Sequence, residues 1–278
     1  MADATPRQLP LEIAPDTFLV RAVQFSLGSA LSTNHNSLVI RAAEPVVVDT
    51  GMVTNRDTWF DDVFSLVEPD DVRWIYLTHD DDDHAGNLNE ALERCPNATV
   101  VISWAAAGRM CAAFGIPRER IHAVDDGETL DVGDRALRAV RPPVYDSAYT
   151  RGVFDPTTRV LHAADAFCAP MPAEPVDHVD QIPVEMWEPG FAMFHHFSLC
   201  PWVAMVDETR FRAEVGKLAA LDAEVIVAAH TPVISGPSIE RAFGLLAALP
   251  STVPPPLAPG GGVLVAGHSV ERPAGEGS

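Results

Sequence analysis

The sequence predicts an α/β fold, and more narrowly a four-layer αββα sandwich in which helices enclose two sheets. Short β-branched runs between turn residues indicate strands, and segments with apolar residues three and four apart indicate helices. Strand and helix alternate through the first part of the chain, as they do in layered α/β proteins. Each half holds expected strands followed by expected helices, without an internal repeat of fixed period, and this favours the αββα order.

The first half supplies most of the expected strands. They are predicted at residues 18–25, 37–41, 45–49, 72–78 and 98–103, each ended by turn residues or by a change to helical spacing. Helical spacing is clearest for Trp59, Val63 and Val67. On this basis helices are predicted at residues 57–67, 85–95 and 104–114.

The second half begins with a meander of short strands that ends with residues 152–155 and 159–162. A helix is then expected at 211–221, a strand at 224–228 and a last helix at 239–249, which Pro250 ends. The expected domain covers residues 16–250. An N-terminal extension (1–15) precedes it, and a flexible Pro/Gly-rich tail (251–278) follows it.

Charge and cysteine spacing restrict the partners. A formal charge of −20 repels nucleic acid and anionic membranes, and no apolar stretch approaches the ~18–20 residues that span a bilayer. The four cysteines lack CxxC spacing, and the first residues lack the pattern of a signal peptide. We therefore expect a cytoplasmic protein with reduced thiols that binds neither nucleic acid nor a membrane.

The run Thr78-His79-Asp80-Asp81-Asp82-Asp83-His84 carries the strongest chemical signal. It follows a buried strand, which is a common position for sites in α/β proteins. Four adjacent carboxylates repel one another unless water or a cation compensates them, and a solvated helix N-terminus is the structural alternative. The two flanking histidines favour metal binding. Such a loop can serve two metals about 3.5–4 Å apart, because His79 and Asp81 can share one direction while Asp83 and His84 share another.

This run resembles the HxHxDH signature of the metallo-β-lactamase superfamily. The resemblance extends from about Ser26 to Gly236. Residues 49–51 (DTG) are similar to the family's DTG turn, residues 161–167 (LHAADAF) to the segment with its bridging aspartate, and residues 227–232 (VAAHTP) to the segment with its last histidine ligand. The resemblance implies the αββα metallo-β-lactamase fold and two bound metals.

Two departures from the family pattern are informative. The second ligand of the signature is histidine in the hydrolases and glutamate in the flavodiiron reductases, whereas here it is Asp81. The third ligand of the first metal is usually histidine, whereas the corresponding loop here offers Asp146, as in the di-iron hydroxylase branch. The alternative for Asp146 is a plain loop residue, so that the site has lost a ligand.

The resemblance thus implies a first metal held by His79, Asp81 and Asp146. It implies a second metal held by Asp83, His84 and His230, with Asp165 bridging the two. Four carboxylates and three neutral imidazoles carry a formal charge of −4, which balances two divalent ions. Oxygen-rich ligands favour iron or manganese, although zinc is not excluded.

Three residues are candidates for acting on the substrate. Asp83 belongs to the signature itself. His35 is expected in a loop similar to the family's substrate-side edge, with a surface histidine as the alternative. Tyr149 follows Asp146 by three residues and would donate a hydrogen bond to a bound oxygen, with a packing role as the alternative.

The expected function is that of a di-iron oxidoreductase that binds O2 or oxidises a small molecule. The 278 residues leave no room for a flavodoxin domain, so electrons would come from a separate donor protein or from the substrate. The alternative is a metal-dependent hydrolase of an ester, thioester, lactone or phosphoester that uses a bridging hydroxide. A metal-binding sensor without turnover is a third possibility, because fold alone does not decide function. The resemblance also implies a possible homodimer.

Overall fold

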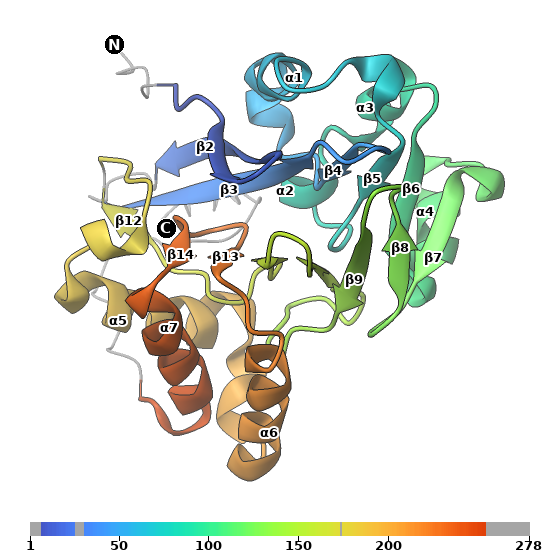
Figure 1. Ribbon diagram of the computed structural model, residues 1–278. Helices are drawn as coiled ribbons and strands as arrows, with labels where there is room; N and C mark the ends of the chain where they lie inside the picture. The colour runs from blue at the N-terminus through green and yellow to red at the C-terminus, as the bar shows by residue number, and fades with distance from the viewer. Residues whose placement is uncertain (1–6, 26–30, 173, 254–278) are drawn as a thin grey trace, which may run out of the picture.

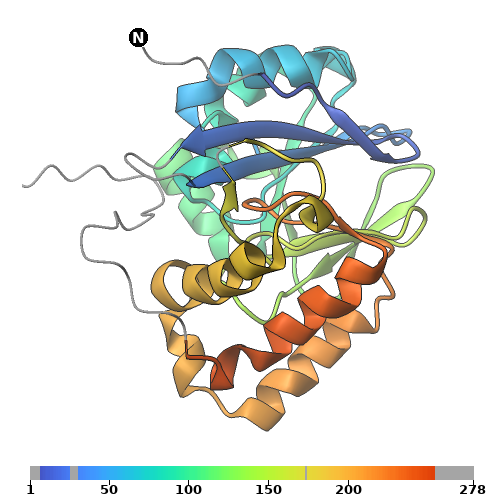
Figure 2. The ribbon, with the colours of Figure 1, turned by 90° about the vertical axis from the view of Figure 1, so that its left-hand side faces the viewer.

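Two sheets pack face to face and helices cover both outer faces, so the predicted αββα layering is confirmed. The computed structural model describes residues 7–25, 31–172 and 174–253. Helices α1, α3 and α4 lie on one side of the sandwich and α5, α6 and α7 on the other (Figures 1 and 2). The predicted tail falls mostly outside the described residues.

The first sheet has eight strands, with the order β1-β2-β3-β4-β5-β6-β7 and β12 paired to β3. The strands β1 to β4 are antiparallel, and β4 to β7 run parallel. Their bounds are β1 (Leu11–Ala14), β2 (Thr17–Phe25), β3 (Leu31–Ile40), β4 (Val46–Val48), β5 (Trp74–Tyr76), β6 (Thr99–Ser103), β7 (Ile121–Val124) and β12 (Met171–Pro172).

The second sheet has six strands, with the order β14-β13-β11-β10-β9-β8. Only the β11–β13 pair is parallel. The bounds are β8 (Thr129–Asp131), β9 (Ala136–Val140), β10 (Gly152–Asp155), β11 (Val160–His162), β13 (Val225–Val227) and β14 (Ile234–Ser235).

Three apolar cores hold the four layers together, because successive strand residues point to opposite faces. In β6, Val100 packs on the helices and Val101 packs between the sheets. In β11, Val160 packs between the sheets and Leu161 packs on the second helical layer.

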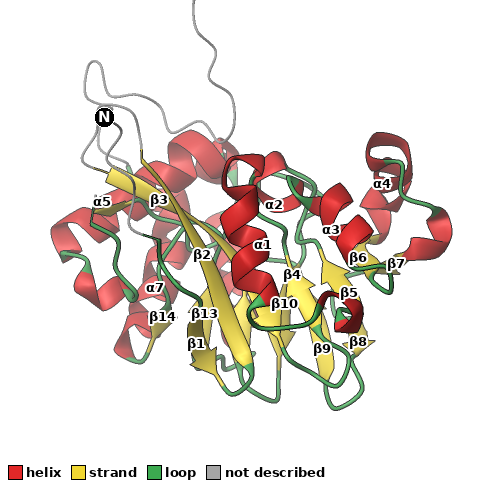
Figure 3. Cartoon of the chain, turned by 90° about the horizontal axis from the view of Figure 1, so that it is seen from above, coloured by secondary structure: helices red, strands yellow, loops and turns green. Residues whose placement is uncertain are grey.

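The α-helices are α1 (Arg56–Phe64), α2 (Asp82–Ala85), α3 (Leu88–Arg94), α4 (Ala107–Phe114), α5 (Val184–Phe194), α6 (Glu208–Ala219) and α7 (Pro237–Ala248). Figure 3 shows α1 lying across the first sheet.

Some predicted elements differ from the observed ones. The helix expected at 85–95 is split into α2 and α3, because the side-chain amide of Asn87 donates to the carbonyls of Thr50 and Met52. Gly86 is required at this break, since a Cβ there would lie 2.4 Å from the carbonyl oxygen of Asp82. No helix was predicted over α5, which contains Pro189. The residues Leu11–Ala14 of the expected extension form β1 and pair with β2.

The parallel strands determine where polar side chains gather. Asp49 and His79 follow the carboxyl ends of β4 and β5, and Asp165 and His230 follow those of β11 and β13. Ligand sites in α/β sheets form at this edge.

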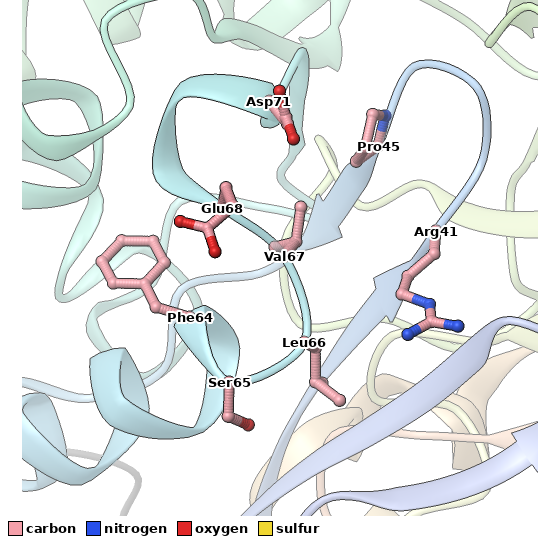
Figure 4. A pocket seen from close by; sticks show the side chains of 8 residues that line it. All are labelled: Arg41, Pro45, Phe64, Ser65, Leu66, Val67, Glu68 and Asp71. Carbon is pink, nitrogen blue, oxygen red and sulfur yellow. The ribbon is translucent and has the colours of Figure 1, made fainter.

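A surface hollow near the start of β4 and β5 lies at the opposite edge (Figure 4). It is lined by Arg41, Pro45, Phe64, Ser65, Leu66, Val67, Glu68 and Asp71. It shares none of the predicted site residues.

Candidate metal centre

The four adjacent aspartates divide into different environments. Asp83 is buried at the second position of α2, whereas Asp82 is exposed. The Asp80 side chain is nearly enclosed and pairs with Arg109, at 2.7 Å. The Asp81 side chain is half exposed and faces His79. Of the four, Asp81 and Asp83 are the aspartates that face the histidines of the predicted site, at 3.7 Å from His79 and 3.1 Å from His230.

The turn after β4 fixes the orientation of His84. The Asp49 carboxylate lies 2.8 Å from Nδ1 of His84 and also accepts from the hydroxyl and the amide of Thr78. The Thr50 amide donates to the carbonyl of His84. A ring that donates its Nδ1 proton to a carboxylate presents the lone pair of Nε2 on the other side. The sequence offered the DTG motif as a signal but did not reveal this role for Asp49.

Asp165 lies in a tight turn after β11. Ala164 and Phe167 have φ angles of +51° and +70°, which non-glycine residues rarely adopt. The turn is held by the loop after β13, because the Ala229 amide donates to the Ala164 carbonyl and the Ala169 amide donates to the His230 carbonyl. The Asp165 side chain is only 2% exposed. Such local strain persists only when the surroundings over-determine it, and it is common at functional sites.

The loop of His230 is joined to β3 of the other sheet. The side-chain amide of Asn36 donates to the carbonyls of Ala228 and Thr231, both at 2.8 Å. Nδ1 of His230 lies 2.7 Å from the carbonyl oxygen of Asn34, which can only accept. The Nε2 atom of His230 is thereby turned toward the carboxylates. The Asn residues of β3 were not singled out from the sequence.

The structure brings the seven predicted ligands into two adjoining groups around Asp165. Oδ2 of Asp165 lies 3.3 Å from Nε2 of His79, which in turn lies 3.7 Å from oxygens of Asp81 and Asp146. Oδ1 of Asp165 lies 3.2 Å from Nε2 of His84 and 3.3 Å from Nε2 of His230. Oδ2 of Asp165 thus faces the first group, and Oδ1 faces the second.

Asp83 completes the second group. Its Oδ2 atom lies 3.1 Å from Nε2 of His230 and 3.6 Å from Nε2 of His84. Ligand atoms on one metal with bonds of about 2.1 Å are separated by about 3.0–3.4 Å. The spacing in this group is close to that range.

His35 lies in strand β3 and not in a loop, so this part of the prediction was wrong. The run of residues that includes Asn34 and Asn36 has loop-forming character, but it is held in the strand by nine paired positions with β2. The residue as a whole is only 7% exposed, so it is not a surface histidine. Its centroid lies 5.0 Å from that of His230, with the two rings at 80°.

Tyr149 lies against Arg109, whose guanidinium carbon is 5.1 Å from the ring centroid. Arg109 also pairs with Asp80, at 2.7 Å. Arg109 thus connects Tyr149 with Asp80, beside the first group.

The pKa values reflect the crowding of the two groups. Burial alone would lower the pKa of His230, but the carboxylates of Asp165 and Asp83, at 3.3 and 3.1 Å from its Nε2 atom, outweigh burial and raise the pKa to about 10. Burial likewise opposes the low pKa of Asp83, which the neighbouring imidazoles hold well below its usual range. Burial and the charge of Asp165 raise the pKa of Asp146 to about 6. Without cations, protons on His84 and His230, whose pKa values are raised, therefore compensate the carboxylates.

Comparisons with known proteins identify the family of this chain. The family model described as "ODP family beta lactamase" matches residues 32–231. The diflavin flavoprotein A 1 of Synechocystis is 29% identical over 146 residues, which cover 52% of this chain and 25% of that protein. The anaerobic nitric oxide reductase flavorubredoxin of Pectobacterium atrosepticum is 26% identical over 136 residues, which cover 49% of this chain and 27% of that protein.

The fold is similar to that of solved flavodiiron structures. The rubredoxin oxygen:oxidoreductase of Desulfovibrio gigas aligns with a TM-score of 0.76 at 20% identity, covering 86% of this chain and 60% of that one. The chain spans about a third or less of the length of the curated relatives that it matches first. Because the family model covers most of the chain, and the motifs occur in the family's order within its fold, this chain belongs to the ODP family of beta-lactamase-fold proteins, in the metallo-β-lactamase superfamily.

Proposed function

We propose that this chain is a dinuclear iron oxidoreductase that reduces dioxygen or nitric oxide. In this proposal His79, Asp81 and Asp146 hold the first metal. Asp83, His84 and His230 hold the second. Asp165 bridges the pair, and the placement of its two oxygens between the two groups is the observation on which the proposal mainly rests.

Unpartnered buried atoms support the presence of cations. Both carboxylate oxygens of Asp165 and the Nε2 atom of His79 are buried without a hydrogen-bond partner among the described residues. A buried charged group without a partner is costly, so such atoms need another compensating species. Two divalent cations would balance the four carboxylates of the centre and accept the inward lone pairs.

The donor set supports iron over zinc. The four aspartates supply hard oxygen donors, and the first group has a single imidazole. Hard oxygen ligands suit iron and manganese, whereas zinc sites are more often rich in nitrogen or sulfur. The names of the relatives agree, since one is a nitric oxide reductase and a structural neighbour is an oxygen:oxidoreductase.

The residues around the centre orient its ligands and leave one side open. Asp49 and the Asn34 carbonyl fix the tautomers of His84 and His230. Asp81 and Asp146 have side chains 48% and 32% exposed, so a small diatomic substrate would approach on the side of the first group. Tyr149, three residues after Asp146, would donate a hydrogen bond to substrate bound on this side.

A bound iron pair would supply one-electron chemistry and Lewis acidity at this position. Electrons would come from a separate donor protein, for which a rubredoxin-type or flavin-containing donor is the natural choice given the names of the relatives. On the described residues, no helix has the length and apolar character required to cross a membrane. The homodimer remains a prediction.

The test is metal analysis combined with gas consumption. Protein from iron-supplemented cells should contain two irons per chain, show a ferric–carboxylate absorption band, and consume O2 or NO when supplied with reduced rubredoxin. Asp82→Ala, which alters an exposed member of the same acidic run, should retain metal and turnover. Tight zinc, rapid ester hydrolysis and no gas consumption would contradict the proposal and favour the hydrolase alternative.

A further inference from the structure

The side chain of His35 occupies a position that resembles those of the predicted ligands. It is 6% exposed, and its Nδ1 atom lies 3.6 Å from Oδ2 of Asp83. That nitrogen has no hydrogen-bond partner among the described residues. Potential ligand atoms of His35, Asp83 and His230 all lie within 4.8 Å of one another.

The outer nitrogen of the ring determines which lone pair faces inward. Nε2 of His35 lies 3.1 Å from the side-chain oxygen of Gln24, across the β2–β3 pair. An amide oxygen accepts and cannot donate, so Nε2 carries the proton. Nδ1 is then an acceptor, and it faces a carboxylate oxygen that is also an acceptor. Two acceptors at this separation are not joined by a hydrogen bond, and a cation between them would satisfy both.

The same arrangement occurs at the two neighbouring histidines. His84 donates outward to Asp49, and His230 donates outward to the Asn34 carbonyl. Each presents its inner nitrogen to Oδ2 of Asp83, at 3.6 and 3.1 Å. His35 repeats both features, with Gln24 as its outer acceptor. An outer acceptor that fixes the tautomer is the usual companion of a metal-ligating histidine.

We propose that His35 is a further ligand of the second metal, through Nδ1. The inference rests on the proposed dinuclear centre and adds to it a third imidazole at the second metal. The two metal positions then differ in chemistry. The first has one imidazole and three aspartates, and the second has three imidazoles and two aspartates. Asp165 is counted at both positions. The second position favours a softer divalent ion than the first does.

Paramagnetic proton NMR of the protein loaded with Co2+ tests this ligand directly. A histidine that binds Co2+ through one nitrogen keeps a solvent-exchangeable N–H on the other, and this proton is shifted far downfield. The wild-type protein with two Co2+ per chain should show four such signals, from His35, His79, His84 and His230. His35→Ala should lose one of them and bind its second Co2+ about tenfold or more weakly.

Two further variants sharpen the test. His122→Ala removes a histidine of β7 whose ring packs on Trp74 away from the centre, and it should keep all four signals and both affinities. Gln24→Ala should shift or broaden only the signal that His35→Ala removes. Circular dichroism of the metal-free variants shows whether each one folds.

Three shifted signals in the wild-type protein, or a signal set unchanged by His35→Ala, would overturn the inference. The result is separable from the proposed function. Four signals in a protein that reduces neither O2 nor NO would support the His35 ligand and contradict the oxidoreductase. Three signals in a protein that does reduce O2 or NO would contradict only the His35 ligand.

Discussion

The two groups of side chains on either side of Asp165 differ in exposure and in chemistry. Around the first, Asp81 and Asp146 have side chains 48% and 32% exposed. Around the second, the side chains of Asp83, His84 and His230 are between 2% and 7% exposed. The first group is thus rich in carboxylate and open to solvent, while the second is rich in imidazole and enclosed.

The origin of this difference lies in the elements that carry each group. Asp81 precedes α2 and Asp146 lies in the loop after β9, so neither is covered by the sheets. His84 and His230 are held from behind by Asp49 and by β3. We infer that the open position exchanges metal and meets substrate more readily, while the enclosed one retains its metal. Loops carry the adaptable part of a site, and the scaffold carries the fixed part.

Asp165→Ala should give the largest effect, because this residue serves both groups. Metal content should fall from two per chain to nearly zero, measured by elemental analysis after growth with iron. Asp165→Asn keeps the side-chain volume and removes the negative charge. Comparing it with Asp165→Ala therefore separates the effect of the lost charge from the effect of the cavity that Ala leaves. If Asp165→Asn retained two metals, the bridging role would be wrong; circular dichroism reports whether both variants fold.

Asp146→Ala should affect only the open side. The first metal should bind about tenfold or more weakly while the second remains, leaving close to one metal per chain after dialysis. Asp146→His, which places the ligand usual in the family at this position, should keep two, as should the control Asp82→Ala. Two retained metals in Asp146→Ala would mean that Asp146 is a plain loop residue.

We expect pH to have a smaller effect on metal affinity, and this effect should differ between the two metal positions. Metal binding displaces protons from its ligands. Asp146 has a pKa of about 6, so affinity at the first position should rise up to about pH 6 and then level off. The pKa of His230 is raised to about 10 and that of His84 is also raised, so affinity at the second position should keep rising between pH 7 and 8.5, by up to about tenfold per pH unit for each proton that the metal displaces. Titrations with Co2+ at several pH values separate the two; equal slopes would contradict the assignment.

The raised pKa of His230 should also make the stability of the metal-free protein depend on pH. The folded-state pKa of His230 lies above the value of 6.5 that an unfolded chain would have. Its contribution is therefore fully present below about pH 6.5 and is lost as the pH rises toward 10. The thermal midpoint of the metal-free protein should fall between pH 7 and 9.5, and saturating metal should reduce that fall.

The amino-acid pattern predicted the layers and the order of most elements, and the resemblance of its motifs to those of the metallo-β-lactamase superfamily named the seven side chains that the structure brings together. Alternating apolar residues fix which strand face is buried, and the ends of the predicted strands place His79, Asp165 and His230 at one edge of the sheets. That is local information, and it can be taken from a single sequence. The break at Gly86-Asn87 and the helix α5 were not predicted, because tertiary hydrogen bonds and packing override local propensity there.

Only the tertiary structure decided how each ligand is oriented and which histidines share the centre. Asp49 and His84 are 35 positions apart, and His35 and His230 come from different sheets, so their contacts follow from folding and not from spacing. The sequence predicted His35 in a loop, whereas in the structure it lies in β3, paired with β2 and buried beside Asp83. Tautomers, exposure and the lone pairs that face a cation depend on these long-range contacts, and a linear pattern does not contain them.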